Sequence, residues 1–135
     1  LFTIGEEQQV RLRLADSMRY IVSQRLAPKV GGGRQLLTEI MGHNLRTREA
    51  IALGESENRS FYEIIEASSP FGWITFDHSI LAAYEAGTIS EETANLFASK
   101  KGRTTRGIDL IKKTHGIDNQ AATGLRLDLP VGAGR

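Results

Sequence analysis

Residues 72–92, GWITFDHSILAAYEAGTISEE, are the most informative segment of this chain about its fold. Thr75 can accept a backbone N–H at the start of a helix through its hydroxyl, and Gly87 suits the left-handed residue that commonly ends one. Ser90 then begins the next helix, and the two acidic residues after it are favoured by the positive end of the helix dipole. The stretch therefore predicts two short helices joined at Gly87, a unit typical of packed helical domains.

Upstream, residues 3–26 predict one long amphipathic helix. Thr3 and Glu6 match a capping box, and Pro28 disfavours helical angles in the residue before it, which should end the helix. The apolar residues recur at three- and four-residue intervals: Val10, Leu14, Met18, Ile21, Val22 and Leu26. That spacing is typical of a helix with one buried face.

Three consecutive glycines, residues 31–33, separate this helix from a segment of different character. Residues 34–41, RQLLTEIM, favour a strand, and the glycines allow a short arm before it to fold back. We therefore expect a β-hairpin at about residues 29–41.

Three further helices are expected. One lies around residues 44–53 and ends before Gly54, and another begins at the capping-box pair Ser60 and Glu63. The last runs from about 104 to 115, with Gly116 as its stop signal. Residues 116–135 lose helical periodicity and predict a flexible tail, so the domain proper is expected over residues 1–115.

Together these elements predict a mainly α fold, a helical domain with a small β-hairpin. The 135 residues suit one domain with a core of its own, and the chain has no cysteine, which excludes disulfides and thiolate chemistry. Seventeen basic and sixteen acidic residues leave a formal net charge of +1, so no global field draws the chain to nucleic acid. No apolar run approaches the ~20 residues of a membrane-spanning helix, and no secretory pattern opens the chain. We expect a soluble, unexported protein, and the first residues, without a methionine, predict a piece of something longer.

Nucleotide hydrolysis is not predicted for this segment alone. A phosphate-binding loop needs glycines followed by lysine and a hydroxyl residue before a helix, whereas residues 31–33 are followed by Arg34 and a strand. His43, His78 and His115 lack the spacing of metal ligands, so no metal site is expected. No catalytic set of nucleophile, base and orienting group can be assembled from these residues.

Two clusters have a structural and a functional interpretation. Lys100, Lys101, Arg103 and Arg106 form a basic group, which a free-standing helical adaptor or nucleic-acid-binding module would use; solvated helix-end charges are the alternative, and no nucleic-acid partner is expected. The aromatic residues Phe71, Trp73 and Phe76 are expected to bury against Phe61 and Tyr62, with an interface as the alternative.

Several of these segments, in this order, resemble the carboxyl-terminal region of type IV pilus retraction (twitching motility) ATPases of the type II/IV secretion ATPase superfamily. The resemblance covers residues 1–113. Its residues are the Leu1-Phe2 turn, the segments EQQVR (7–11) and IVSQRL (21–26), the turn VGGGR (30–34) with EIM (39–41), and the pattern Gly72, Thr75, Asp77, Gly87 and Glu91. The family signature AIRNLIR on the next short helix is represented by RTREAIAL, residues 46–53, in which most positions differ.

The resemblance implies the distal part of a RecA-like α/β ATPase core that works as a hexameric motor in the cytoplasm, peripheral to the inner membrane through its partners. It implies ATP and Mg²⁺ as cofactors of the full-length protein and none in this segment. The implied partners are the protein's own upstream ATPase domain, the other copies of a homo-hexamer, and the pilus base. Candidate coupling or interface residues are Arg34, Arg46, Arg48, Thr75 and Asp77.

Overall fold

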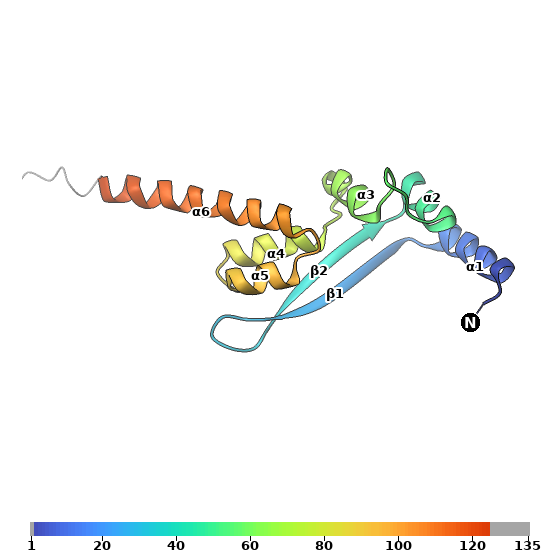
Figure 1. The fold of residues 1–135 in the computed structure, drawn as a ribbon, viewed down its shortest axis with the longest axis horizontal. Coiled ribbons are helices and arrows are strands. Elements are labelled where there is room, and N and C mark those ends of the chain that lie inside the picture. The colour runs from blue at the N-terminus through green and yellow to red at the C-terminus, as the bar shows by residue number, and fades with distance from the viewer. Residues whose placement is uncertain (1, 125–135) are drawn as a thin grey trace, which may run out of the picture.

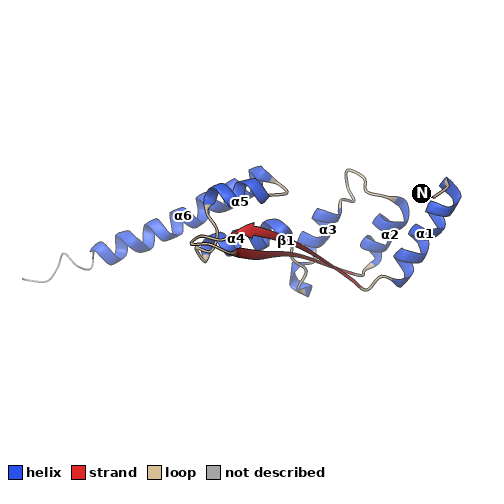
Figure 2. Cartoon of the chain, turned by 90° about the horizontal axis from the view of Figure 1, so that it is seen from below, coloured by secondary structure: helices blue, strands red, loops and turns tan. Residues whose placement is uncertain are grey.

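The computed structural model describes residues 2–124, and for residues 117–124 it describes the helix but not the side chains. It confirms a mostly helical fold with one antiparallel two-stranded sheet. The elements are α1 (Ile4–Ser17), β1 (Tyr20–Pro28), β2 (Arg34–Gly42), α2 (Leu45–Leu53), α3 (Phe61–Ala67), the 3-10 turn η1 (Ser69–Phe71), α4 (Phe76–Glu85), α5 (Glu91–Phe97) and α6 (Lys101–Gly124). Figures 1 and 2 show the hairpin running along the molecule, with α1 and α2 at one end and α4 to α6 toward the other.

The first helix is shorter than its apolar pattern predicts. The capping box is present, since the Thr3 hydroxyl accepts the Glu6 N–H and the Glu6 carboxylate accepts the Thr3 N–H, but α1 ends at Ser17. The expected continuation to residue 26 is wrong, because Tyr20–Pro28 forms strand β1. Aromatic and β-branched residues at the start of this segment favour a strand. Pairing with β2 then supplies hydrogen-bond partners for the backbone of the segment, as a helix would.

The hairpin is longer than expected and its first arm lies earlier. Nine antiparallel pairs run from Tyr20↔Gly42 to Pro28↔Arg34. Strand β2 confirms the predicted second arm, whereas the first arm occupies β1, not the residues directly before the glycines. Gly31, Gly32 and Gly33 all have φ between 81° and 105°, the left-handed region that glycine adopts without steric cost, so they turn the chain between the strands.

Two hydrophobic clusters pack against the same hairpin. The first lies toward α1, α2 and α3 and contains Ala15, Met18, Met41, Ala50, Ile51, Ile64, Ile65 and Trp73. The second lies toward the hairpin turn and α4 to α6 and contains Ala27, Leu37, Phe76, Ile80, Ala83, Ile89, Ala94 and Ile108. Strand β2 contributes Met41 to one and Leu37 to the other, so the hairpin joins two packed halves.

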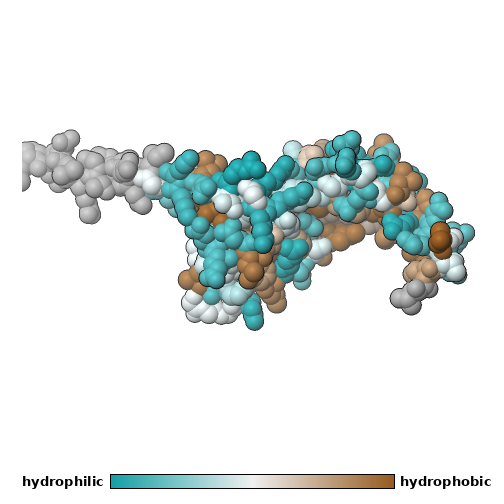
Figure 3. Space-filling view, in the orientation of Figure 1, coloured by the Kyte–Doolittle hydropathy of each residue, from teal (hydrophilic) through white to brown (hydrophobic). Residues whose placement is uncertain are grey.

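The outer face of the hairpin carries large apolar side chains in contact with solvent. Tyr20, Val22 and Leu26 of β1 are 70%, 56% and 59% exposed, and Leu36 of β2 is 46% exposed. Alternate residues of a strand point to the same face, and the register pairs Val22 with Ile40 and Leu26 with Leu36 on it. Figure 3 shows hydrophobic surface along the hairpin. We call this set, Tyr20, Val22, Leu26, Leu36 and Ile40, the outer apolar face.

The predicted caps of the middle helices are confirmed, while the predicted end of the last helix is wrong. The Thr75 and Ser90 side chains accept N–H groups of His78 and Thr93, and Gly87 follows α4 with φ 72°. Helix α6 continues through Gly116 to Gly124 and projects beyond the rest of the molecule (Figure 1). A glycine inside a helix costs only about 1 kcal/mol and does not end it. Residues 125–135 of the expected tail lie outside the described residues.

Candidate functional site

A buried carboxylate joins three elements beside the first turn of α4. Asp77 is 3% exposed, and its oxygens accept the Tyr62 hydroxyl at 2.9 Å, the Ser99 N–H at 2.7 Å and the Lys100 N–H at 2.9 Å. Tyr62 belongs to α3, and the two N–H groups belong to the two residues just before α6. Because three donors satisfy the buried carboxylate, Asp77 holds α3, α4 and α6 together. We call it the Asp77 junction.

Cations and a second carboxylate surround the Tyr62 ring. Arg103 pairs with Glu66, and the Lys100 ammonium and the Arg103 guanidinium lie 5.3 Å and 5.6 Å from the ring centroid. Burial, the hydrogen bond to Asp77 and the nearby negative charges raise the pKa of Tyr62 to about 12. Its hydroxyl therefore stays protonated and donates to Asp77 at every ordinary pH.

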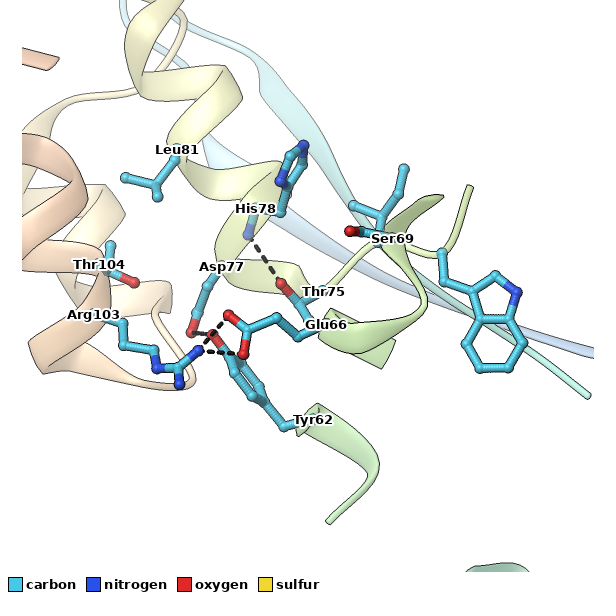
Figure 4. Close-up of a pocket in the computed structure, with 11 residues that line it drawn as sticks. Tyr62, Glu66, Ser69, Thr75, Asp77, His78, Leu81, Arg103 and Thr104 are labelled. Atoms are coloured by element: carbon cyan, nitrogen blue, oxygen red, sulfur yellow. Dashed lines mark hydrogen bonds and ion pairs between the residues drawn. The ribbon is translucent and has the colours of Figure 1, made fainter. Parts of the chain in front are cut away.

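A cavity of about 260 Å³ opens beside the junction, between α3, η1, α4 and the start of α6. Figure 4 shows Thr75, Asp77, His78 and Thr104 on its walls, with the Thr104 hydroxyl turned toward α4. The Thr75 hydroxyl accepts the His78 N–H at 3.2 Å, so the helix cap is part of the wall. The cavity is lined by both halves of the molecule, because α3 belongs to one cluster and α4 and α6 to the other.

The predicted site residues do not form one constellation. Thr75 and Asp77 lie together at the cavity, whereas Arg34 is exposed at the start of β2. Arg46 is exposed on α2, and Arg48 of the same helix bonds the Asp16 carboxylate at 2.8 Å across to α1. The Asp16 and Arg48 side chains are 59% and 42% exposed, which makes the pair a surface contact of small energy. A coupling role for these residues stays a prediction.

Sequence reasoning missed Tyr62, Glu66 and Thr104 at this site and assigned Arg103 to a basic surface cluster. No local signal marks them, because the junction forms only when residues 15 to 23 positions from Asp77 fold against it. One charge of the basic cluster is compensated, since Arg103 pairs with Glu66.

The aromatic residues Phe71, Trp73 and Phe76 separate in the fold. Trp73 is buried in the first cluster, against which Phe61 also packs, and Phe76 is buried in the second. The Arg25 guanidinium stacks 3.9 Å from the centroid of the Phe76 ring. Phe71 is 82% exposed, so its expected burial is wrong. It closes the short turn η1 just before Gly72, and the left-handed angle of that glycine redirects the chain.

Among residues 2–116, whose side chains the structure describes, no group of histidine and acidic side chains is arranged to hold a metal ion. The helices of residues 2–124 include none with the length and apolar character of a membrane span.

No protein-family model matches the chain. It is 32% identical over 94 residues to the type IV pilus retraction ATPase PilT of Pseudomonas aeruginosa, an alignment that covers 70% of this chain and 27% of PilT. A crystal structure of the pilus retraction motor PilT with bound ADP superposes on 78% of the chain with a TM-score of 0.57 and 29% identity. The chain belongs to the type II/IV secretion ATPase family.

A second member of that family supports the fold alone. The Legionella pneumophila ATPase DotB superposes on 70% of the chain with a TM-score of 0.51 and 21% identity, and the match covers 25% of DotB. The PilT crystal-structure match covers 29% of that chain. The chain thus spans between a quarter and a third of the length of these secretion ATPases.

Proposed function

We propose that this chain is the carboxyl-terminal portion of an ATP-driven motor for pilus retraction. The observation that carries the proposal is the similarity to PilT in both sequence and fold over most of the chain. In this proposal ATP and Mg²⁺ bind in the ATPase domain upstream of the matched region. The chain itself lacks the lysine and hydroxyl pair of a phosphate-binding loop and supplies a mechanical part.

The outer apolar face supports an upstream ATPase domain as the first partner. An exposed apolar surface on a two-stranded sheet is unusual for a domain that works alone, because such a sheet needs a covered face to be stable. The backbone N–H and carbonyl groups of Ile40 in β2 bond those of Ile74, which covers the outer edge of β2 at this residue. Within residues 2–124, β1 pairs with β2 alone, so its other edge can accept a further strand.

A second apolar surface lies on the opposite side of the hairpin. A groove of about 670 Å³ runs between α1, the strands, α2 and α3, with Met41, Ile51 and Ile65 among its apolar lining residues. Covering both surfaces with one ATPase domain would place the hairpin inside a larger core.

The proposed assembly is a homo-hexamer in the cytoplasm, held at the inner membrane by the pilus base.

Coupling between ATP hydrolysis and movement is proposed for Arg34, Arg46, Arg48, Thr75 and Asp77. Two positions are favoured by geometry: Arg48 links α2 to α1 through Asp16, and Asp77 links the two packed halves. In this proposal ATP and ADP favour different states of the ring, and residues that bridge elements transmit the shift between those states.

Removing the gene and then complementing it tests the motor. Cells without the protein should keep surface pili but lose retraction, and the intact gene should restore it. Normal retraction in the deletion strain rejects the proposal.

Complementation with Arg48→Ala then tests coupling. The matched control is Arg13→Ala, which removes an arginine on the exposed face of α1. Loss of retraction at unchanged ATP turnover supports a coupling role, and unchanged retraction removes Arg48 from the mechanism.

A further inference from the structure

Arg25 of β1 is a half-buried cation that takes part in none of the ion pairs among residues 2–116. Its guanidinium instead lies over the Phe76 ring, 3.9 Å from the centroid, at the start of α4. Its Nη1 donates to the Phe97 carbonyl at 2.9 Å and lies 3.4 Å from Ser99 Oγ. One side chain of the hairpin therefore contacts α4, the end of α5 and the residues that follow α5.

The contact with Phe97 places a positive charge at the carboxyl end of α5. Phe97 is the last residue of that helix, and the last turn of α5 has no basic residue of its own. The carbonyl groups at the end of a helix carry partial negative charge, which a cation stabilises. Arg25 supplies this cation from 72 positions away in the sequence, and it thereby fixes the end of α5 against β1.

Residues 97–100, which we call the α5–α6 linker, contact Asp77 as well as Arg25. The Ser99 N–H donates to one oxygen of the Asp77 carboxylate at 2.7 Å, and the Lys100 N–H donates to the other at 2.9 Å. The Lys100 carbonyl then accepts two N–H groups from the first turn of α6. Arg25 and Asp77 therefore hold the same short segment directly before the helix that projects from the molecule (Figure 1).

We propose that Arg25 is a positioning residue that couples the hairpin to α6 through the α5–α6 linker. Because Arg25 and Asp77 restrain the same linker, the contribution of each side chain depends on the presence of the other. Strand β1 and helix α6 therefore move as one body, and loss of Arg25 lets α6 change its direction relative to the hairpin. These contacts lie within the chain, so the coupling holds or fails independently of the proposed motor function.

A double-mutant cycle in urea measures the coupling in the 135-residue chain. Arg25→Met keeps an unbranched apolar side chain and removes the cation, and Asp77→Asn weakens the other restraint. The double variant should lower the ratio of folded to unfolded protein roughly three- to tenfold less than the product of the two single effects. A double effect within about twofold of that product would mean independent restraints and would overturn the proposal. Arg19→Met, an exposed arginine just before β1, is the matched control and should combine with Asp77→Asn as a simple product.

Residual dipolar couplings of backbone N–H groups test the orientation of α6 directly, at a concentration where the chain is monomeric. This measurement needs only the Arg25 variants, so it does not depend on the folding of Asp77→Asn. In the unaltered chain one alignment tensor should fit both the hairpin and α6, whereas Arg25→Met should require two. Arg25→Lys keeps a cation for the Phe97 carbonyl and should restore the single tensor. A single tensor in Arg25→Met, or separate tensors in the unaltered chain or in Arg25→Lys, would overturn the proposal.

Discussion

The Tyr62 hydroxyl donates to the Asp77 carboxylate over 2.9 Å, and this bond joins two halves of the molecule that otherwise pack into separate clusters. The same carboxylate accepts the N–H groups of Ser99 and Lys100, which lead into α6. One side chain therefore sets the relative position of α3, α4 and α6. In the proposed motor, this junction would make α3, α4 and α6 move together.

Replacing Asp77 with asparagine should destabilise the fold. The asparagine side chain would present an amide N–H₂ where the carboxylate accepted donors, so at least one of three charge-assisted bonds is lost. Hydrogen bonds to charged groups contribute about 1.5–3 kcal/mol each, and we expect a loss of about 2 kcal/mol in the free energy of unfolding, measured by urea titration. Asp16→Asn, which weakens only the exposed contact with Arg48, should cost about 0.5 kcal/mol or less. Equal losses in the two variants would contradict a central role for Asp77.

Stability should decline at high pH through Tyr62. The pKa of this residue is raised to about 12 in the folded protein, above the value of about 10 for an unfolded tyrosine. A raised pKa means that the neutral form is favoured in the fold, so its contribution is full below pH ~10 and is lost as the pH rises to about 12. Lysines also titrate in this range, so Tyr62→Phe provides the reference. The difference between the two unfolding free energies should shrink from pH 9 to 12 (roughly the titration range), and a constant difference would refute the assignment.

Gly42 should tolerate no side chain. A Cβ at this position would stand 2.6 Å from Nε1 of Trp73, far inside van der Waals contact with a buried ring. Gly42→Ala should therefore lower the free energy of unfolding by about 1–3 kcal/mol, the usual cost of overpacking. Gly5→Ala in α1, where a Cβ meets nothing within 4 Å, should be neutral or stabilising by up to about 1 kcal/mol. Thermal unfolding of both variants measures the contrast, and a harmless Gly42→Ala would show that Trp73 can move.

The outer apolar face should make the isolated chain self-associate. We expect the weight-average sedimentation coefficient to rise with protein concentration, because the exposed apolar strands of two chains can pack against each other. Val22→Lys places a charge in the middle of this face and should shift the chain toward monomer. Ser56→Lys adds the same charge in an exposed turn between α2 and α3 and serves as the control. If both variants associate as the unaltered chain does, the outer face is not the contact.

The predictions were correct where the residues that decide an element lie close together in sequence, and wrong where they lie far apart. Thr75 and Ser90 begin their helices as expected, since each side chain bonds an N–H three residues later. The helix prediction for residues 20–28 is wrong because the four-residue spacing of Val22 and Leu26 places both on one face of a strand as well as of a helix. The choice between the two depends on pairing with Arg34–Gly42. Helix α6 passes Gly116 because a single glycine is a weak signal against a continuing helix.

The helix caps, the glycine turn of the hairpin and the break at Gly87 could all be predicted from the order of the residues. These features rest on contacts between neighbouring residues, which any fold of this chain would retain. The strand at Tyr20–Pro28 and the donors to Asp77 from residues 15, 22 and 23 positions away became evident in the folded molecule alone. Bonds over such separations form only after packing brings the elements together, so no local pattern of residues could have indicated them.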